Sequence, residues 1–178
     1  MTSTNEHGSR IYLLSIVLVA IIGGLLFGYD TAVVSGAEKA LENFFRSGLG
    51  DLYTSGWHGF TASSALLGCV IGGAISGLLA SRFGRKRSLL IAAVLFFISA
   101  LGSWWPESGI LPYGAPTKTL LVVFNFYRIL GGVGVGLASA VCPMYIAEIS
   151  PAKIRGTLVS CNQFAIIFGM LVVYFVNY

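Results

Sequence analysis

Residues 11–37 read IYLLSIVLVAIIGGLLFGYDTAVVSGA, a run in which Asp30 is the only charged side chain. A helix rises about 1.5 Å per residue, so roughly 20 apolar residues cross the ~30 Å hydrocarbon core of a bilayer. The run is too long for the apolar core of a signal peptide, and no small-residue cleavage pattern follows it. It therefore predicts a transmembrane helix.

Four more apolar runs follow along the chain. They predict further spans at about 59–80, 88–105, 119–146 and 157–178. A transmembrane β-barrel would instead show segments of about ten residues with alternating apolar side chains. The chain also has 23 glycines in 178 residues, and small residues let helices approach closely in lipid. The sequence therefore predicts an all-α membrane protein with five transmembrane helices.

The composition excludes several other classes of protein. Of the residues, 56% are hydrophobic and 10% are charged, whereas soluble domains carry about 25% charged residues. Intrinsic disorder needs the opposite balance. The net charge of +4 does not indicate a nucleic-acid partner, because the basic residues lie in short breaks between apolar runs. The expected surroundings are the lipid bilayer.

No pattern in the chain indicates catalysis or metal binding. Cys69, Cys142 and Cys161 lie inside or at the ends of apolar runs without CxxC spacing, so we expect small buried side chains rather than a metal site. No Ser/His/Asp triad, HExxH or Walker pattern is present. The sequence therefore predicts neither an enzyme nor a bound cofactor.

The distribution of Lys and Arg predicts the orientation of the chain. Seven of them fall on one side of the predicted spans and three on the other; the seven are Arg10, Arg82, Arg85, Lys86, Arg87, Lys153 and Arg155. The side richer in Lys and Arg faces the cytoplasm in most membrane proteins. We therefore expect a cytoplasmic N-terminus.

Asp30 and Arg128 are the two charges inside predicted spans. A charge at the centre of a span costs about 2.5–3.5 kcal/mol on insertion scales, so such residues usually face a bundle interior and have a partner. Asp30 lies eight residues before Glu38 and Arg128 ten residues after Lys118, which places both about 12–15 Å below the outer face. The pair predicts either a protonatable carboxylate with a guanidinium partner or a static ion pair.

The last span carries amide side chains, and Gln163 is the most central of them. An amide in an apolar helix needs hydrogen-bond partners. It contacts a hydroxyl-rich solute or bridges neighbouring helices, and the residues alone favour neither. Phe27 is suited to stack on a sugar ring or to pack in the bundle.

Glycine spacing predicts close helix contacts. The pairs Gly24/Gly28, Gly68/Gly72 and Gly73/Gly77 follow the small-xxx-small pattern, and residues 131–136 read GGVGVG inside a span. That stretch lacks the spacing and the strand–helix context of a nucleotide loop. Between the second and third spans, residues 77–87 place four cations around Gly84, which predicts a tight turn.

Five motifs, taken together and in this order, resemble the sugar porters of the major facilitator superfamily, and among them the D-xylose–proton symporters. They are GGLLFGYDT at 23–31, RFGRK at 82–86, YR at 127–128, PMYIAE at 143–148 and RG at 155–156. The resemblance covers nearly the whole chain from Tyr12 onward. It implies a fold of two six-helix halves, each made of inverted three-helix repeats, of which this chain is the N-terminal half without its sixth helix.

The resemblance also implies roles for individual residues. Asp30 corresponds to the proton-coupling carboxylate and Arg128 to its partner. Gln163 corresponds to a sugar-binding glutamine and Phe27 to an aromatic residue of the sugar pocket. A cytoplasmic gate is implied for the charged residues Arg82, Arg85, Glu148 and Arg155.

The function implied is proton-coupled transport of D-xylose or a similar monosaccharide across the inner membrane, driven by the proton gradient. The partners are then the sugar, the proton and a C-terminal half absent from this chain. Met170 stands where the xylose porters have a second sugar-contacting glutamine, and Ser81 where the superfamily has Asp. The alternative is a non-transporting fragment, or a half-transporter that assembles with a separate chain.

Overall fold

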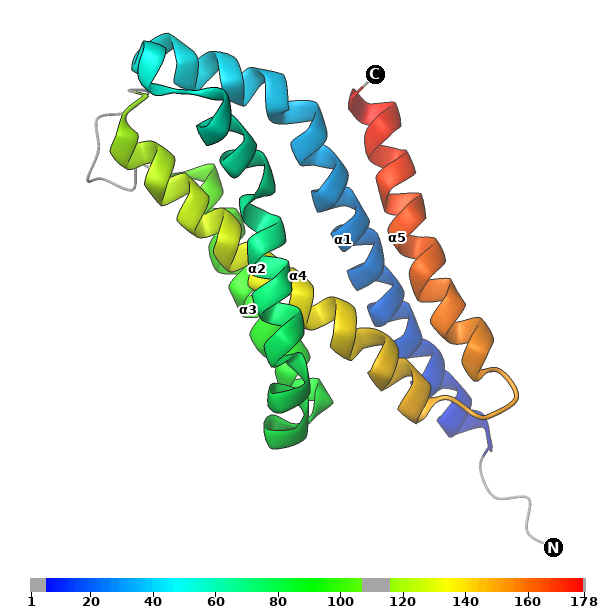
Figure 1. Ribbon diagram of the computed structural model, residues 1–178. Helices are drawn as coiled ribbons and strands as arrows, with labels where there is room; N and C mark the ends of the chain where they lie inside the picture. Colours follow the sequence, from blue (N-terminus) through cyan, green and yellow to red (C-terminus); the bar gives the residue numbers. More distant parts are fainter. Residues whose placement is uncertain (1–5, 107–115, 178) are drawn as a thin grey trace, which may run out of the picture. The chain divides into compact units, whose positions relative to one another are not determined.

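A computed structural model of the chain describes residues 6–106 and 116–177, apart from the side chains of residues 6–16, 19, 20 and 26. Figure 1 shows that the described part of the chain consists almost entirely of long helices. They are α1 (Glu6–Leu49), the 3₁₀ helix η1 (Gly50–Leu52), α2 (Ser55–Phe83), α3 (Arg85–Trp104), α4 (Lys118–Ile149) and α5 (Arg155–Asn177). The all-α fold class with five long helices is confirmed.

Four of the described helices are long and apolar enough to cross a membrane, namely α2, α3, α4 and α5, with mean hydropathies of 1.7–1.9 over their best windows. α1 contains the apolar run at residues 11–37, part of whose side chains lie outside the described set.

α1 extends twelve residues beyond the predicted end of the first span at residue 37. The extension carries Glu38, Glu42 and Arg46, and the Arg46 guanidinium lies 3.1 Å from Glu42 Oε1, one turn away. Glu, Lys and Arg are good helix formers. The charged residues therefore end the apolar run, but the helix continues through them. Gly50 follows with φ of +52°, a left-handed conformation that suits glycine and stops the helix.

The chain forms two compact units. The first consists of residues 1–36 and 142–178, in which α1 and α5 lie side by side (Figure 1). A Cβ on Gly24 would lie 2.8 Å from Asn162 Oδ1, and a Cβ on Gly169 would overlap the Leu25 carbonyl oxygen. The two backbones therefore touch along one seam, as the small residues predicted.

The second unit, residues 37–141, packs α2 and α3 against α4 in the same way. A Cβ on Gly68 would overlap the Ile129 carbonyl oxygen, and a Cβ on Gly132 would overlap that of Ala65. The contact predicted for Gly73/Gly77 is not found among the described residues, because none of their atoms lies within 4 Å of a Cβ at either position. Those glycines lie on the side of α2 that faces away from α4. The four-residue spacing of small residues is therefore not sufficient to predict a helix contact.

Candidate functional site

Asp30 lies in the part of α1 that belongs to the first unit, and its side chain is half-buried. Arg128 lies in α4, in the second unit, and is also half-buried. Ten residues separate it from Lys118, the first residue of α4, so it lies about 15 Å along that helix. Each residue is described within its own unit, and their pairing stays a prediction.

The two residues predicted to bind sugar both belong to the first unit, beside the α1–α5 seam. Asn162 faces α1 and is 3% exposed, while Gln163, the next residue, is exposed. Phe27 directly precedes Gly28, where a Cβ would overlap the Ile166 carbonyl oxygen. Gly28, next to Phe27, and Asn162, next to Gln163, both lie at backbone contacts between α1 and α5. These contacts therefore fix the positions of Phe27 and Gln163 along the two helices.

Asn162 is anchored a second time, from the end of α4 that lies in the same unit. Cys142 Sγ lies 3.8 Å from Asn162 Oδ1, within the range of a thiol hydrogen bond. Met170, the departure from the xylose-porter pattern, is half-buried two turns after Gln163. Residues seven apart share a helix face, so a glutamine at position 170 would lie on the same face as Gln163.

The tight turn predicted between the second and third helices is confirmed. Gly84 alone separates α2 from α3, with φ of +81° and ψ of 159°. Arg85 Nη1 donates to the Ala80 carbonyl oxygen at 3.2 Å, across the turn. The Arg82 guanidinium lies 6.0 Å from the centre of the Phe83 ring, within reach of a cation–π interaction.

The other half of the predicted cytoplasmic gate lies in the first unit. Glu148 is exposed near the end of α4, and Arg155 is exposed at the start of α5. Arg155 Nη2 donates to the Ser150 carbonyl oxygen at 3.5 Å. Because these residues and the Arg82–Arg85 turn belong to different units, a latch between them stays a prediction.

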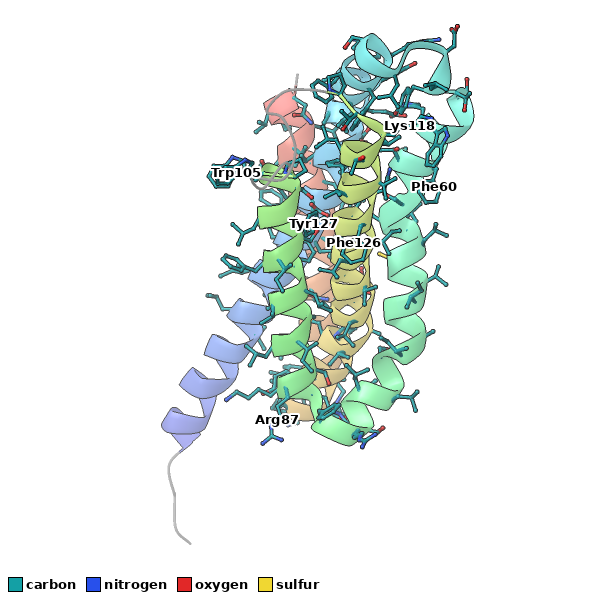
Figure 2. All side chains as sticks on the ribbon, turned by 90° about the vertical axis from the view of Figure 1, so that its left-hand side faces the viewer. Phe60, Arg87, Trp105, Lys118, Phe126 and Tyr127 are labelled. Atoms are coloured by element: carbon teal, nitrogen blue, oxygen red, sulfur yellow. The ribbon has the colours of Figure 1, made fainter. Side chains whose placement is uncertain are left out.

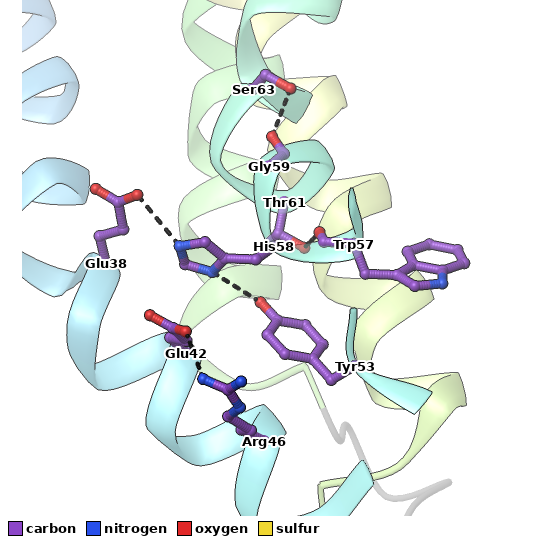
Figure 3. A network of polar contacts seen from close by, with 9 residues as sticks. All are labelled: Glu38, Glu42, Arg46, Tyr53, Trp57, His58, Gly59, Thr61 and Ser63. Atoms are coloured by element: carbon purple, nitrogen blue, oxygen red, sulfur yellow. Dashed lines mark hydrogen bonds and ion pairs between the residues drawn. The ribbon is translucent and has the colours of Figure 1, made fainter. Parts of the chain in front are cut away.

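Sequence reasoning missed a polar network around His58, which Figure 3 shows. His58 Nε2 lies 3.2 Å from Glu38 Oε1, and His58 Nδ1 lies 3.2 Å from the Tyr53 hydroxyl. A neutral ring satisfies both contacts when Nε2–H donates to the carboxylate and the tyrosine donates to Nδ1. The network therefore ties the α1 extension to the first turn of α2.

Tyr53, one member of this network, lies in an environment that shifts its pKa. It is 5% exposed and packs on Phe45, with ring centroids 5.7 Å apart. Burial raises the pKa of Tyr53 above its ordinary value, and the negative charge of Glu42 adds to the rise, whereas a hydrogen bond with Thr61 opposes it. The hydroxyl is thus held in its protonated form, in which it can donate.

Comparison with known proteins bears on all of these residues. The family model described as "Sugar (and other) transporter" matches residues 16–178. The chain is 56% identical to the D-xylose-proton symporter of Escherichia coli K12, over 98% of the chain and 37% of that protein. It is 39% identical to the arabinose-proton symporter of Bacillus subtilis, over 98% of the chain and 33% of that protein.

Solved structures agree with this match. The inward-open conformation of the xylose transporter XylE from E. coli superposes with a TM-score of 0.84 at 54% identity, covering 94% of this chain and 40% of that one. The proton:xylose symporter XylE bound to 6-bromo-6-deoxy-D-glucose superposes with a TM-score of 0.86 at 53% identity. The match covers 96% of this chain and 38% of that one. The chain thus spans well under half the length of these relatives.

Proposed function

Because the chain belongs to the sugar transporter family, we propose that it is the N-terminal portion of a proton-coupled sugar symporter. The observation that carries the proposal is Asp30, a carboxylate within an apolar run of α1 and within residues 16–178, which the family model matches. A carrier without proton coupling has no need of a titratable group at that depth. The site of action is the inner membrane, with the N-terminus in the cytoplasm.

The proposed cycle follows from the charge on Asp30. A proton from outside neutralises the carboxylate and weakens its attraction for Arg128. Sugar binds near the bilayer midplane, where Gln163 offers hydrogen bonds and Phe27 an apolar face. The loaded protein then opens inward, and loss of the proton to the cytoplasm restores the charge. A ligand shifts such an equilibrium only by its different affinity for the two states.

The charged residues at the cytoplasmic end act on the same equilibrium. Arg82 and Arg85 flank a turn of fixed geometry, while Glu148 and Arg155 lie at the ends of helices in the other unit. Attraction between these groups stabilises the outward-facing state in the proposal. Opening inward separates them.

The proposed substrate is D-xylose or a similar monosaccharide. Relatives named for xylose, arabinose and glucose all match the chain. Met170 removes one amide from the face that carries Gln163. A binding site with fewer amide groups makes fewer hydrogen bonds to sugar hydroxyls, so we expect a sugar preference that differs from that of the xylose porters.

Proton coupling is tested by the pH of a weakly buffered suspension of de-energised cells that express the complete polypeptide. Addition of D-xylose, D-glucose or L-arabinose should raise the external pH as protons enter with the sugar. Sugar entry without a pH change would favour facilitated diffusion and contradict symport.

The alternative function is a non-transporting fragment or a half-transporter. The chain spans 37% of the E. coli xylose symporter. The length of the native gene product separates the two. A product about as long as the relatives supports a complete symporter, whereas a product of 178 residues directs the search to a separate C-terminal chain.

A further inference from the structure

Ser99 in α3 makes a hydrogen bond to a different helix. Its hydroxyl donates to the Tyr127 carbonyl oxygen of α4 at 2.7 Å, and the residue is 9% exposed. A serine inside a helix often bonds a carbonyl oxygen of its own preceding turn, as Ser76 and Ser139 do here. The Ser99 bond instead joins α3 to α4 within the second unit.

The bond falls on the backbone next to Arg128. The carbonyl group that accepts it belongs to the peptide group that joins Tyr127 to Arg128. A carbonyl oxygen has two lone pairs, so the same oxygen can also accept the helical N–H of Gly131, one turn later. Ser99 therefore holds the backbone from which Arg128 projects and leaves the hydrogen bonds of α4 in place.

Two glycines make room for this contact. A Cβ on Gly131 would overlap Ser99 Oγ and would lie 2.9 Å from Ser99 Cβ. A Cβ on Gly102, one turn after Ser99 in α3, would overlap the Tyr127 ring. Figure 2 shows Tyr127 where α3 and α4 lie side by side. Residue 127 is therefore held by α3 at its main chain and at its side chain.

The contact between α3 and α4 continues beyond this point. A Cβ on Gly134 would lie 2.9 Å from the Ala92 carbonyl oxygen. Tyr127, Gly131 and Gly134 are spaced by four and three residues, so they share one face of α4. A helix held along one face over two turns cannot rotate without breaking these contacts. The contacts therefore fix the direction in which Arg128 leaves α4, about 100° around the helix from Tyr127.

This direction matters for the proposed proton coupling. A guanidinium presents its donors in a rigid planar fork, so its fit to a partner depends on where its side chain begins. A nearby cation favours the ionised form of a carboxylate, and the attraction weakens with distance. A rotation of α4 would therefore change how strongly Arg128 acts on the carboxylate of Asp30.

We propose that Ser99 is a positioning residue for proton coupling. Its hydroxyl holds the peptide group between Tyr127 and Arg128, so that α3 sets the direction of the Arg128 guanidinium. The inference rests on the proposed function, in which Arg128 is the partner of Asp30. It adds to that function a residue on α3 that acts through Arg128 and not on the sugar.

The pH dependence of sugar exchange tests this role in the complete polypeptide, reconstituted in liposomes. Exchange is measured at equal pH and equal sugar concentration on both sides, with whichever of D-xylose, D-glucose and L-arabinose exchanges fastest. Ser99→Ala removes the hydroxyl and keeps a residue that favours the helix. Ser76→Ala is the matched control, because Ser76 is 7% exposed and bonds the Gly73 carbonyl oxygen of its own helix.

We expect the proton concentration at half-maximal exchange to fall about threefold in Ser99→Ala, because a guanidinium that is held less firmly stabilises the ionised carboxylate less. Ser76→Ala should leave that concentration unchanged. Gly131→Ala, whose Cβ would displace the Ser99 hydroxyl, should change it in the same direction as Ser99→Ala. In Arg128→Gln, which lacks the charge, the addition of Ser99→Ala should cause no further change.

Thermal midpoints of the same variants separate a loss of stability from a change in the pH profile. An unchanged pH profile in Ser99→Ala, whatever its thermal midpoint, would overturn the proposal. An equal change in Ser76→Ala would also overturn it, and so would a further change when Ser99→Ala is added to Arg128→Gln. Exchange that does not depend on pH in the parent protein would contradict the proposed symport, and the positioning role with it.

Discussion

Gly28 on α1 lies directly against the backbone of Ile166 on α5, so that a Cβ on Gly28 would overlap the Ile166 carbonyl oxygen. Backbone atoms cannot move aside as a flexible side chain can. The contact therefore fixes the distance and the register between the helix that carries Asp30 and Phe27 and the helix that carries Gln163.

Gly28→Ala is expected to separate α1 from α5 and to lower the free energy of unfolding by about 1–3 kcal/mol, the usual range for overpacking. Gly23→Ala is the matched control, because a Cβ there meets no atom of the described residues within 4 Å. The control should be neutral or stabilise by up to about 1 kcal/mol through helix propensity. Thermal unfolding in detergent measures both; equal midpoints would contradict the packing account.

Gly84→Ala is expected to lower the free energy of unfolding by about 1–3 kcal/mol. The φ of +81° and ψ of 159° at Gly84 lie in a region that is essentially restricted to glycine. Gly77→Ala serves as the control, because a Cβ at this position in α2 would lie more than 4 Å from every atom that the structure describes outside its own helix. Comparison of the two thermal midpoints checks the prediction, which a stable Gly84→Ala variant would refute.

The raised pKa of Tyr53 predicts that the protein becomes less stable at alkaline pH. Because the folded pKa of Tyr53 is raised, the folded state keeps its proton more tightly than the unfolded state does. The contribution of Tyr53 to the free energy of unfolding is fully present below the pKa of about 10 that tyrosine has in the unfolded state. It is lost as the pH rises toward the pKa of Tyr53 in the folded state. The thermal midpoint, measured from pH 8 to pH 11, should therefore fall above about pH 10.

Tyr53→Phe should reduce that alkaline fall, because phenylalanine does not titrate. At neutral pH it should cost about 0.5–1.5 kcal/mol for the lost hydrogen bond to His58, while the stacking on Phe45 remains. Phe45→Leu is the control that weakens the packing and leaves the hydroxyl in place. If the thermal midpoint of Tyr53→Phe falls at alkaline pH as much as that of the parent protein, groups other than Tyr53 cause the fall.

Gln163→Ala is expected to raise KM for the sugar about tenfold, the effect of losing one hydrogen bond near 1.4 kcal/mol, with kcat nearly unchanged. Phe175→Ala is the control on the same helix, because Phe175 is 77% exposed and lies outside the proposed site. Initial rates of uptake by the complete polypeptide give both constants. An unchanged KM would show that Gln163 does not contribute to sugar binding.

The helices were predictable because apolar runs of about 20 residues admit few other structures in a membrane. The end of α1 was not, because Glu38 marks where the chain leaves apolar surroundings, while the helix continues to Leu49 on good helix formers. The Gly84 turn was predictable, since adjacent spans joined by a short basic segment need a residue with unusual backbone angles.

Contacts between distant residues were less accessible to sequence reasoning. His58 has partners 20 and 5 residues away, and Asn125 and Thr61 are 64 residues apart. Helical spacing says which residues share a face of one helix, but not which residue of another helix that face meets. The glycine pairs illustrate this limit, since Gly24/Gly28 contacts a neighbouring helix whereas Gly73/Gly77 contacts none of the described residues.

The central claim is that Asp30 couples sugar movement to the proton gradient, and Asp30→Asn tests it most directly. In liposomes containing the complete polypeptide, sugar accumulation against its gradient and sugar exchange at equal concentrations are measured side by side. The amide has nearly the same shape and cannot ionise, so we predict that accumulation is abolished while exchange continues. Full accumulation by Asp30→Asn would contradict the account.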